Sequence, residues 1–189
     1  MKLLPLADEP FVAPTDRDMR PSERRRFVRT HRTCVFGYAR RADGPSMLIV
    51  YYVPTEDDEL LISTMRGRAK TKAITRTGKA SLCVLDERWP FAYLQVYCDA
   101  RLDDEPDLVV DVMMAVGERM SGQPLPREAR PAVQVMAKEE DRVVIRCRPY
   151  STFGQPPRHL HRNDQAERIT HWISPSMPWD AKDPEEGPA

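Results

Sequence analysis

The chain has 189 residues, of which 41% are hydrophobic, so it is long enough to form one domain around a single core. Its 29 lysines and arginines equal its 29 aspartates and glutamates, so the overall charge gives no sign of a nucleic-acid or membrane surface. The apolar run at the start is too short for a signal peptide, and no later window approaches a membrane span, so we expect a cytoplasmic protein without membrane partners.

Residues 1–32 are expected to form an N-terminal arm and a short basic helix. Residues 1–20 are rich in proline and charge, which predicts a loosely ordered arm, and Pro21 is placed to open a helix that runs through Arg29. Seven arginines lie between Arg17 and Arg32. Few aromatic residues alternate with them, so the pattern does not favour nucleic-acid binding.

Residues 33–155 carry the strand patterns and are expected to form the cofactor-binding domain. Strands are predicted over 34–39, 47–53, 60–64, 80–85, 91–102 and 142–148, with Pro149 ending the last one. Helices are predicted over 68–77, 105–120 and 126–138. Strands joined mostly by short turns indicate an antiparallel barrel or sandwich with inserted helices. The four cysteines are far apart and lie in apolar runs, which predicts reduced core residues rather than disulfides or zinc ligands.

Residues 156–189 are expected to be a C-terminal extension, partly disordered from Asp180 onward. Trp172 and Trp179 suggest that it docks onto the barrel or onto a partner subunit. His159, His161 and His171 have no supporting ligand pattern, so no metal site is predicted.

A cationic stretch follows the strand that ends in Ser63 and Thr64. It contains six cations and no acid, namely Arg66, Arg68, Lys70, Lys72, Arg76 and Lys79. Hydroxyl groups, cations and a helix N-terminus together suit a phosphate ester. The alternative is a solvated basic helix face, because Arg68, Lys72 and Arg76 recur at a spacing of four residues.

The order of these parts resembles the flavin-binding split barrels of the pyridoxamine-phosphate-oxidase superfamily and, within it, the deazaflavin (coenzyme F-420)-dependent reductases. The resemblance covers roughly residues 33–155 and is carried by residues 43–45, 60–64, 67–72, 79–82 and 91–96, and more weakly by 142–145. It implies a mainly β (α+β) fold, a six-stranded antiparallel split β-barrel with short helices. It also implies a homodimer with the cofactor site at the interface.

By this resemblance, strand-end hydroxyls and neighbouring cations hold the cofactor phosphate, and the second strand contacts the ring. The cofactor-binding residues would be Leu48, Ile49, Val50, Ser63, Thr64, Arg68, Lys70 and Lys72. No catalytic acid or base is demanded by the sequence. Tyr51, Tyr52, Tyr93 and Tyr97 are candidates for proton donation or ring contact, although strand tyrosines more often serve packing.

The expected function is hydride transfer between bound coenzyme F-420 and a small organic acceptor. F-420 is placed ahead of FMN because its acidic tail would use the cations beyond Arg68 and Lys70, with the arginines at 24–26 extending that path. The alternatives are an FMN-binding split-barrel oxidoreductase, or a non-catalytic protein that binds flavin or haem. The chain departs from the family pattern at Cys98, where relatives commonly have glycine, and at residues 76–78, where an Arg-Asp-Pro turn is usual. The acceptor is left unassigned.

Overall fold

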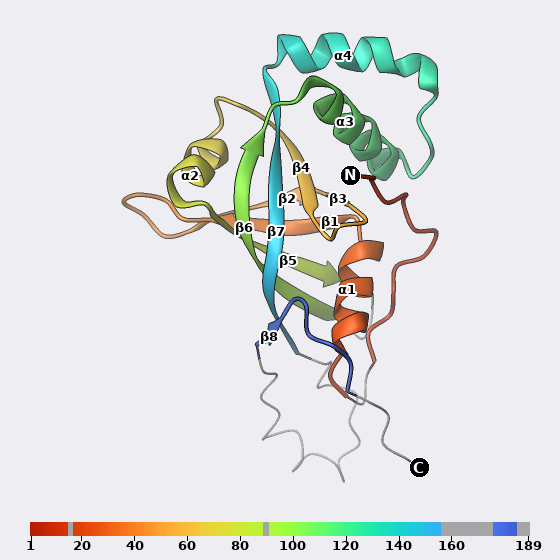
Figure 1. The fold of residues 1–189 in the computed structure, drawn as a ribbon, viewed down its shortest axis with the longest axis vertical. Coiled ribbons are helices and arrows are strands. Elements are labelled where there is room, and N and C mark those ends of the chain that lie inside the picture. Colours follow the sequence, from red (N-terminus) through yellow and green to blue (C-terminus); the bar gives the residue numbers. More distant parts are fainter. Residues whose placement is uncertain (15–16, 89–90, 156–175, 185–189) are drawn as a thin grey trace.

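The computed structural model describes residues 1–14, 17–88, 91–155 and 176–184. A single antiparallel sheet with helices at its ends and sides makes up this part of the chain (Figure 1). In chain order the elements are α1 (Pro21–Thr30), β1 (Thr33–Tyr38), β2 (Ser46–Tyr51), β3 (Val53–Pro54), β4 (Leu60–Met65), α2 (Ala69–Thr77), β5 (Lys79–Asp86), β6 (Ala92–Asp103), α3 (Pro106–Ser121), the 3-10 turn η1 (Arg127–Ala129), α4 (Arg130–Glu139), β7 (Arg142–Gln155) and β8 (Met177–Pro178).

The sheet curls into the predicted split barrel, which confirms the fold class, although the described residues form eight strands where six were predicted. Its strand order is β2-β1-β5-β6-β7-β4-β3, with β8 paired to β7. Only Tyr52 separates β2 from β3, so the two ends of this order are joined through the chain and the sheet must curve back on itself. The side chain of Tyr52 donates a 2.6 Å hydrogen bond to the carbonyl of Val28 in α1, which draws the chain inward where a single strand over 47–53 was predicted.

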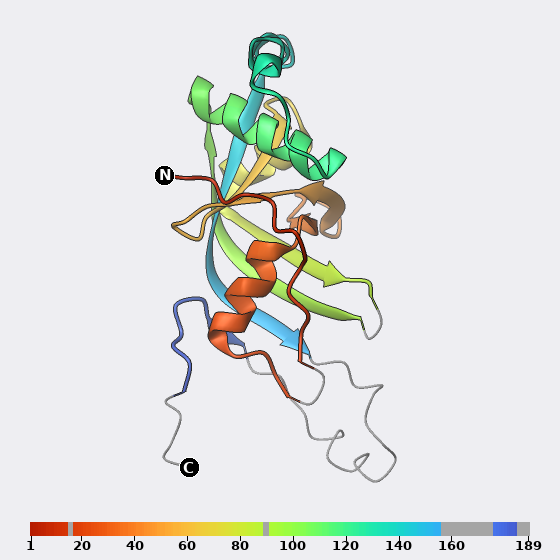
Figure 2. The same ribbon diagram turned by 90° about the vertical axis from the view of Figure 1, so that its right-hand side faces the viewer.

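The helices cover different parts of the sheet (Figures 1 and 2). Helix α2 lies against β6 and β1, whereas α3 packs on β4 and β7 and carries α4 on its far side. Helix α1 lies across the other half of the sheet. None of the helices in the described ranges is long and apolar enough to cross a bilayer.

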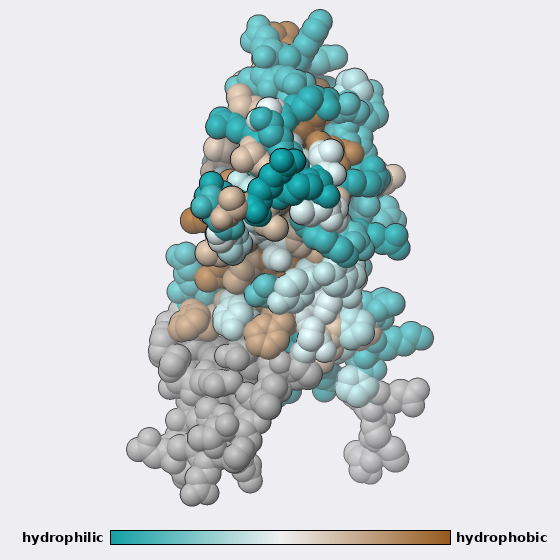
Figure 3. Space-filling view, turned by 90° about the vertical axis from the view of Figure 1, so that its left-hand side faces the viewer, coloured by the Kyte–Doolittle hydropathy of each residue, from teal (hydrophilic) through white to brown (hydrophobic). Residues whose placement is uncertain are grey.

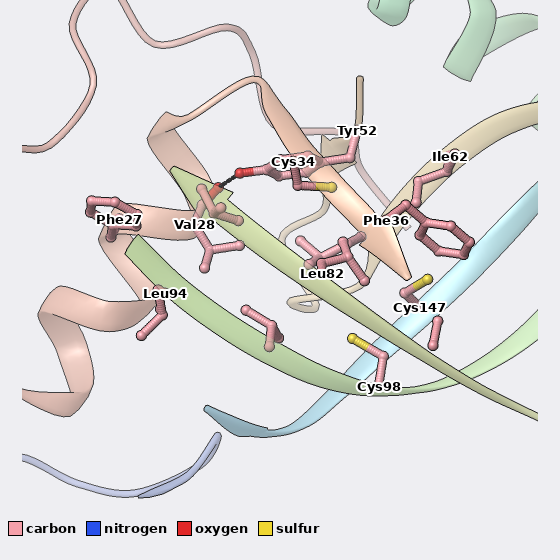
Figure 4. Close-up of a cluster of buried hydrophobic side chains, with 14 of the residues drawn as sticks. Phe27, Val28, Cys34, Phe36, Tyr52, Ile62, Leu82, Leu94, Cys98 and Cys147 are labelled. Atoms are coloured by element: carbon pink, nitrogen blue, oxygen red, sulfur yellow. Dashed lines mark hydrogen bonds between the residues drawn. The ribbon is translucent and has the colours of Figure 1, made fainter. Parts of the chain in front are cut away.

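Two clusters of buried side chains form the interior. The larger cluster lies inside the barrel and contains Phe27, Cys34, Cys98 and Cys147 (Figure 4). Burial raises the pKa of the Cys34 and Cys98 thiols, which keeps them protonated. All four cysteines are free, as predicted. The smaller cluster lies under α3, where valines of that helix meet β3, β4 and β7.

Strand β7 extends beyond Pro149, where it was predicted to stop. Pro149 pairs with Cys98, and the register shifts there so that Ser151 pairs with Tyr97. Tyr150 is therefore the extra residue of a bulge. A proline has no N–H to donate, and a bulge is a place in a sheet that tolerates this loss.

The N-terminal arm is docked on the barrel rather than loosely ordered. The backbone N–H of Leu4 donates to the carbonyl of Pro54 over 2.8 Å, and the buried side chain of Arg119 donates to the carbonyl of Leu4 over 3.0 Å. Ala13 and Met19 are buried in the barrel core. Proline-rich composition did not reveal these contacts because they are made by backbone groups and by residues far along the chain.

The described part of the C-terminal extension also docks, as the tryptophan suggested. Trp179 is buried in the barrel core, and its backbone N–H donates to the carbonyl of Tyr150. The carboxylate of Asp183 accepts hydrogen bonds from the backbone N–H and the hydroxyl of Ser22, which ties this segment to the start of α1. His159, His161, His171 and Trp172 lie outside the described residues.

Three arginines of α1 contact other residues of the same chain. Arg24 is buried and donates to Met19 and Thr152. Arg25 donates to the carbonyls of Trp179 and Ala181, and the guanidinium of Arg26 lies 5.1 Å from the ring of Phe11. They do not extend a cationic path toward α2.

Candidate functional site

The N-terminus of α2 presents free backbone donors. Arg68 is the N-cap residue in an extended conformation and makes no side-chain capping bond. Among the described residues, no acceptor faces the backbone N–H of Ala69 or Lys70. The hydroxyl of Thr71 shares its hydrogen bond between the carbonyls of Arg66 and Arg68, which holds the preceding turn closed. Such an end, with its partial positive charge, suits an anion.

Lys70 is a half-buried cation of this site with a lowered pKa. Its side chain is half-buried, and the pKa of its ammonium group is lowered first by burial and then by the positive charges of Arg68 and Arg142. Within the described ranges, none of Arg68, Lys70 and Lys72 forms an ion pair with a carboxylate. An anion placed here would relieve the repulsion between these cations.

The two strand-end hydroxyls, predicted to act together, lie on opposite faces of β4. Thr64 is buried and shares its face with Leu60 and Ile62, which belong to the barrel core. Ser63 shares its face with Leu61, which packs under α3, and its hydroxyl oxygen is buried without a hydrogen-bond partner among the described residues. One phosphate cannot contact both hydroxyls directly while β4 keeps this geometry.

The residues predicted to contact the cofactor ring lie on β2, a strand that borders a gap in the barrel. Strands β3 and β4 pair at only two positions, Val53 with Leu61 and Pro54 with Leu60. Continued along the chain, this register would place Thr64 opposite Val50, but no pairs form there, so β2 and β4 diverge. Their unpaired backbone edges face this split, close to the turn that leads into α2.

Leu48, Ile49 and Val50 alternate across β2. Leu48 and Val50 pack against the barrel core, whereas Ile49 points outward and is 75% exposed. Only the backbone of β2 can therefore serve as a common contact for all three positions, because a ring on one face meets alternate side chains.

The surplus cations are only partly available. Arg66 forms ion pairs with Asp104 at 2.9 Å and with Asp141 at 3.1 Å. Lys79 pairs with Asp99 at 2.5 Å. In the described part of the chain Lys72 and Arg76 have no carboxylate partner, and Arg76 donates to the carbonyl of Ala39.

Arg142 belongs to this site and was not identified from the sequence as a site residue. It is the first residue of β7 and pairs with Met65, the last residue of β4. This pairing brings its guanidinium close enough to lower the pKa of Lys70, while Glu140 forms a 2.5 Å ion pair with it. The sequence signal is weak, because a charged residue at the start of a strand is common and its partner is far away in the chain.

An apolar surface lies on the outer face of the sheet next to the split. Met47 and Ile49 of β2 are 70% and 75% exposed. Ile49 lies beside Val35, which lies beside Cys83, so the half-exposed row continues across β1 and β5. On the side of the molecule seen in Figure 3, strongly hydrophilic side chains crowd the upper half, whereas more apolar ones gather over the lower half of the described surface.

The site offers anion binding rather than acid–base groups. Of the candidate tyrosines, Tyr52 is fully buried with its hydroxyl engaged by Val28, so it is removed from any reaction. Among the described residues no group of three or more histidines, cysteines or acids is arranged to hold a metal.

Comparison with known proteins gives the family and the fold. The family model described as pyridoxamine 5'-phosphate oxidase matches residues 21–153. The structure is similar to that of the conserved hypothetical protein Rv2991 from Mycobacterium tuberculosis, with a TM-score of 0.65 and 22% identity over 81% of this chain and 96% of that chain. It is also similar to the heme binding protein from Mycobacterium smegmatis, with a TM-score of 0.58 and 11% identity over 86% of this chain and 59% of that one.

A weaker likeness is to an F-420 reductase, with a TM-score of 0.49 and 19% identity over 64% of this chain and 88% of that chain. The first two similarities, at 22% and 11% identity, are similarities of fold. No curated protein sequence matches the chain.

Proposed function

Because the chain belongs to the pyridoxamine 5'-phosphate oxidase family, we propose that it is a cytoplasmic oxidoreductase that holds the phosphate of a flavin-type cofactor at the N-terminus of α2. The proposed reaction is hydride transfer between the cofactor and a small organic acceptor. The ring would lie along the split between β2 and β4, with the β2 backbone at its polar edge.

The observation that carries this proposal is the unbalanced charge at Lys70. Arg142 is paired with Glu140, but Lys70 is half-buried, lies beside Arg68 and has no carboxylate partner in the described part of the chain, so a nearby anion would lower the free energy of the folded protein. The free N–H groups of Ala69 and Lys70 open at the same end of α2. Cations together with free backbone donors favour a phosphate-ester site over the alternative interpretation, a solvated basic helix face.

Coenzyme F-420 is our first candidate for the cofactor and FMN the second. The preference for the longer anion now depends on Lys72 and Arg76, because acids engage Arg66 and Lys79. An acidic tail that leaves the phosphate would run along the exposed face of α2, where both of these side chains lie.

The bound cofactor would supply the hydride chemistry. The part of the protein is to anchor the phosphate through Arg68, Lys70 and the start of α2, and to present backbone groups of β2. No described side chain is required as an acid or base. The anchor and the strand edge belong to one rigid barrel, so they can orient both reactants and exclude water.

A homodimer is part of the proposal. Met47 and Ile49 expose apolar side chains on an edge strand that also borders the split. Such a surface favours association, and a second copy laid against it would close the cofactor site from outside.

The competing proposal is a non-catalytic protein that binds flavin or haem. His31, the histidine within the described ranges, is only 8% exposed and its Nε2 lies 3.8 Å from the carboxylate of the buried Asp86, so haem iron could not reach it while this packing is kept. A turnover assay separates the two functions. Reduced cofactor that is reoxidised only at the background rate across a broad panel of acceptors would indicate storage.

The deciding experiment is a titration of FMN and coenzyme F-420 into the same protein, followed by fluorescence. Arg68→Ala should cost roughly 1.5–3 kcal/mol of affinity for the preferred cofactor, the scale of a charge-assisted hydrogen bond. The exposed Arg127→Ala is the matched control and should leave the affinity unchanged. Binding of neither cofactor would refute the proposal, and unchanged binding by Arg68→Ala would place the phosphate elsewhere.

A further inference from the structure

A pocket lies beside the proposed phosphate site, under the hairpin made by α3 and α4. It has a volume of about 330 Å³. Its apolar wall is formed by Pro106, Val109, Val110 and Ala137, of which the two valines are 3% exposed and the alanine 9%. This volume and wall suit a small organic ligand.

Charged side chains surround the opening, and two of its cations are neutralised: Arg66 pairs with Asp104 and Asp141, and Arg142 pairs with Glu140. The lining includes the cations Arg66, Lys138 and Arg142 and the acids Asp104 and Asp141. Both acids are already bound to Arg66. In the described part of the chain Lys138 has no carboxylate partner, so its ammonium group is free to meet an anion at the rim.

Ion pairs and a backbone hydrogen bond fix the hairpin to the sheet and its two helices to each other. At its base, Arg66 bonds to Asp104, just before α3, and to Asp141, just after α4, while its backbone N–H donates to the carbonyl of Asp141 over 2.9 Å. Arg130, the first residue of α4, bonds to two aspartates of α3, Asp107 and Asp111. A pocket braced in this way needs little rearrangement to accept a ligand.

We propose that this pocket binds a small apolar molecule that carries one carboxylate, separately from the cofactor. The hydrocarbon part would lie on Val109, Val110 and Ala137, and the carboxylate would face Lys138 at the rim. An apolar floor alone would accept neutral and anionic molecules equally, and the uncompensated ammonium group selects the anion.

The test uses 4-phenylbutyrate and its neutral analogue 4-phenylbutanamide, titrated by calorimetry into the full chain without cofactor. The carboxylate should bind about three- to fivefold more tightly than the amide, and Lys138→Glu, which reverses the charge, should weaken its binding by about fivefold or more. Lys182→Glu, at another exposed lysine, is the matched control and should bind like the wild type. Thermal unfolding of each variant verifies that the fold is retained.

Equal affinity for the acid and the amide would overturn the proposal, and so would wild-type affinity in Lys138→Glu or no binding at millimolar concentration. A further titration in the presence of saturating FMN and then of coenzyme F-420 separates this pocket from the cofactor site. Competition would show that the pocket is part of the cofactor site, whereas undisturbed binding supports a second site. If neither cofactor binds, the proposed function fails, but the carboxylate titration still tests this pocket because it is done without cofactor.

Discussion

Replacing Lys70 tests the phosphate anchor most directly. Lys70→Met removes the charge and keeps an apolar stem of similar length. If the ammonium group binds the cofactor phosphate, the dissociation constant should rise roughly ten- to hundredfold, the equivalent of one charge-assisted hydrogen bond. Lys182→Met, at an exposed lysine of the C-terminal segment, is the matched control and should leave the affinity unchanged.

The same variant should behave in the opposite way when no cofactor is present. Burial and the charges of Arg68 and Arg142 lower the pKa of Lys70, so its charged form destabilises the folded state below that pKa. Lys70→Met should therefore be at least as stable as the wild type at neutral pH, measured by urea unfolding. A variant that loses both stability and cofactor would show that Lys70 has a structural role, and one that loses neither would refute the phosphate assignment.

The lowered pKa also predicts how binding depends on pH. When the pH rises through the lowered pKa of Lys70, the ammonium group of the cofactor-free protein loses its proton. Cofactor affinity should therefore fall at a lower pH than it would with a lysine of ordinary pKa. A guanidinium keeps its charge over this range, so Lys70→Arg should flatten the profile. Parallel profiles for the wild type and Lys70→Arg would contradict this linkage.

Three further predictions concern the surroundings of the site. Arg66 holds the turn before α2 through its ion pairs with Asp104 and Asp141. Arg66→Ala and the double variant Asp104→Asn/Asp141→Asn should therefore both weaken cofactor binding in a titration. If Arg66 bound the anion directly, the double variant would bind the cofactor more tightly. Trp179→Ala should cost about 3–5 kcal/mol in chemical denaturation. Trp179→Phe should cost far less, because the indole N–H has no partner in the described part of the chain. Met47→Asp should shift the protein to a monomer in light scattering and lower cofactor affinity with it, and an unchanged dimer would place the interface elsewhere.

Much of the fold follows from local sequence patterns. Alternating apolar residues predicted the strands that form the barrel, and Gly78 marks the end of α2 with a φ of 63°. The pattern failed where a distant partner decided the outcome. Pro149 lies within β7 because a bulge opposite Cys98 accepts it, and Tyr52 divides β2 from β3 because its hydroxyl reaches α1.

The candidate site shows the same division. The sequence by itself determined that a cation-rich turn and a short helix follow a strand, because strand and helix periodicity and the order of charges are local properties. Only the tertiary structure decided which cations remain unneutralised. Arg66 meets acids 38 and 75 positions along the chain, whereas Lys70 meets the further cation Arg142. Charges far apart in sequence become neighbours only when strands pair and helices pack, and their sum at one point sets the affinity for an anion.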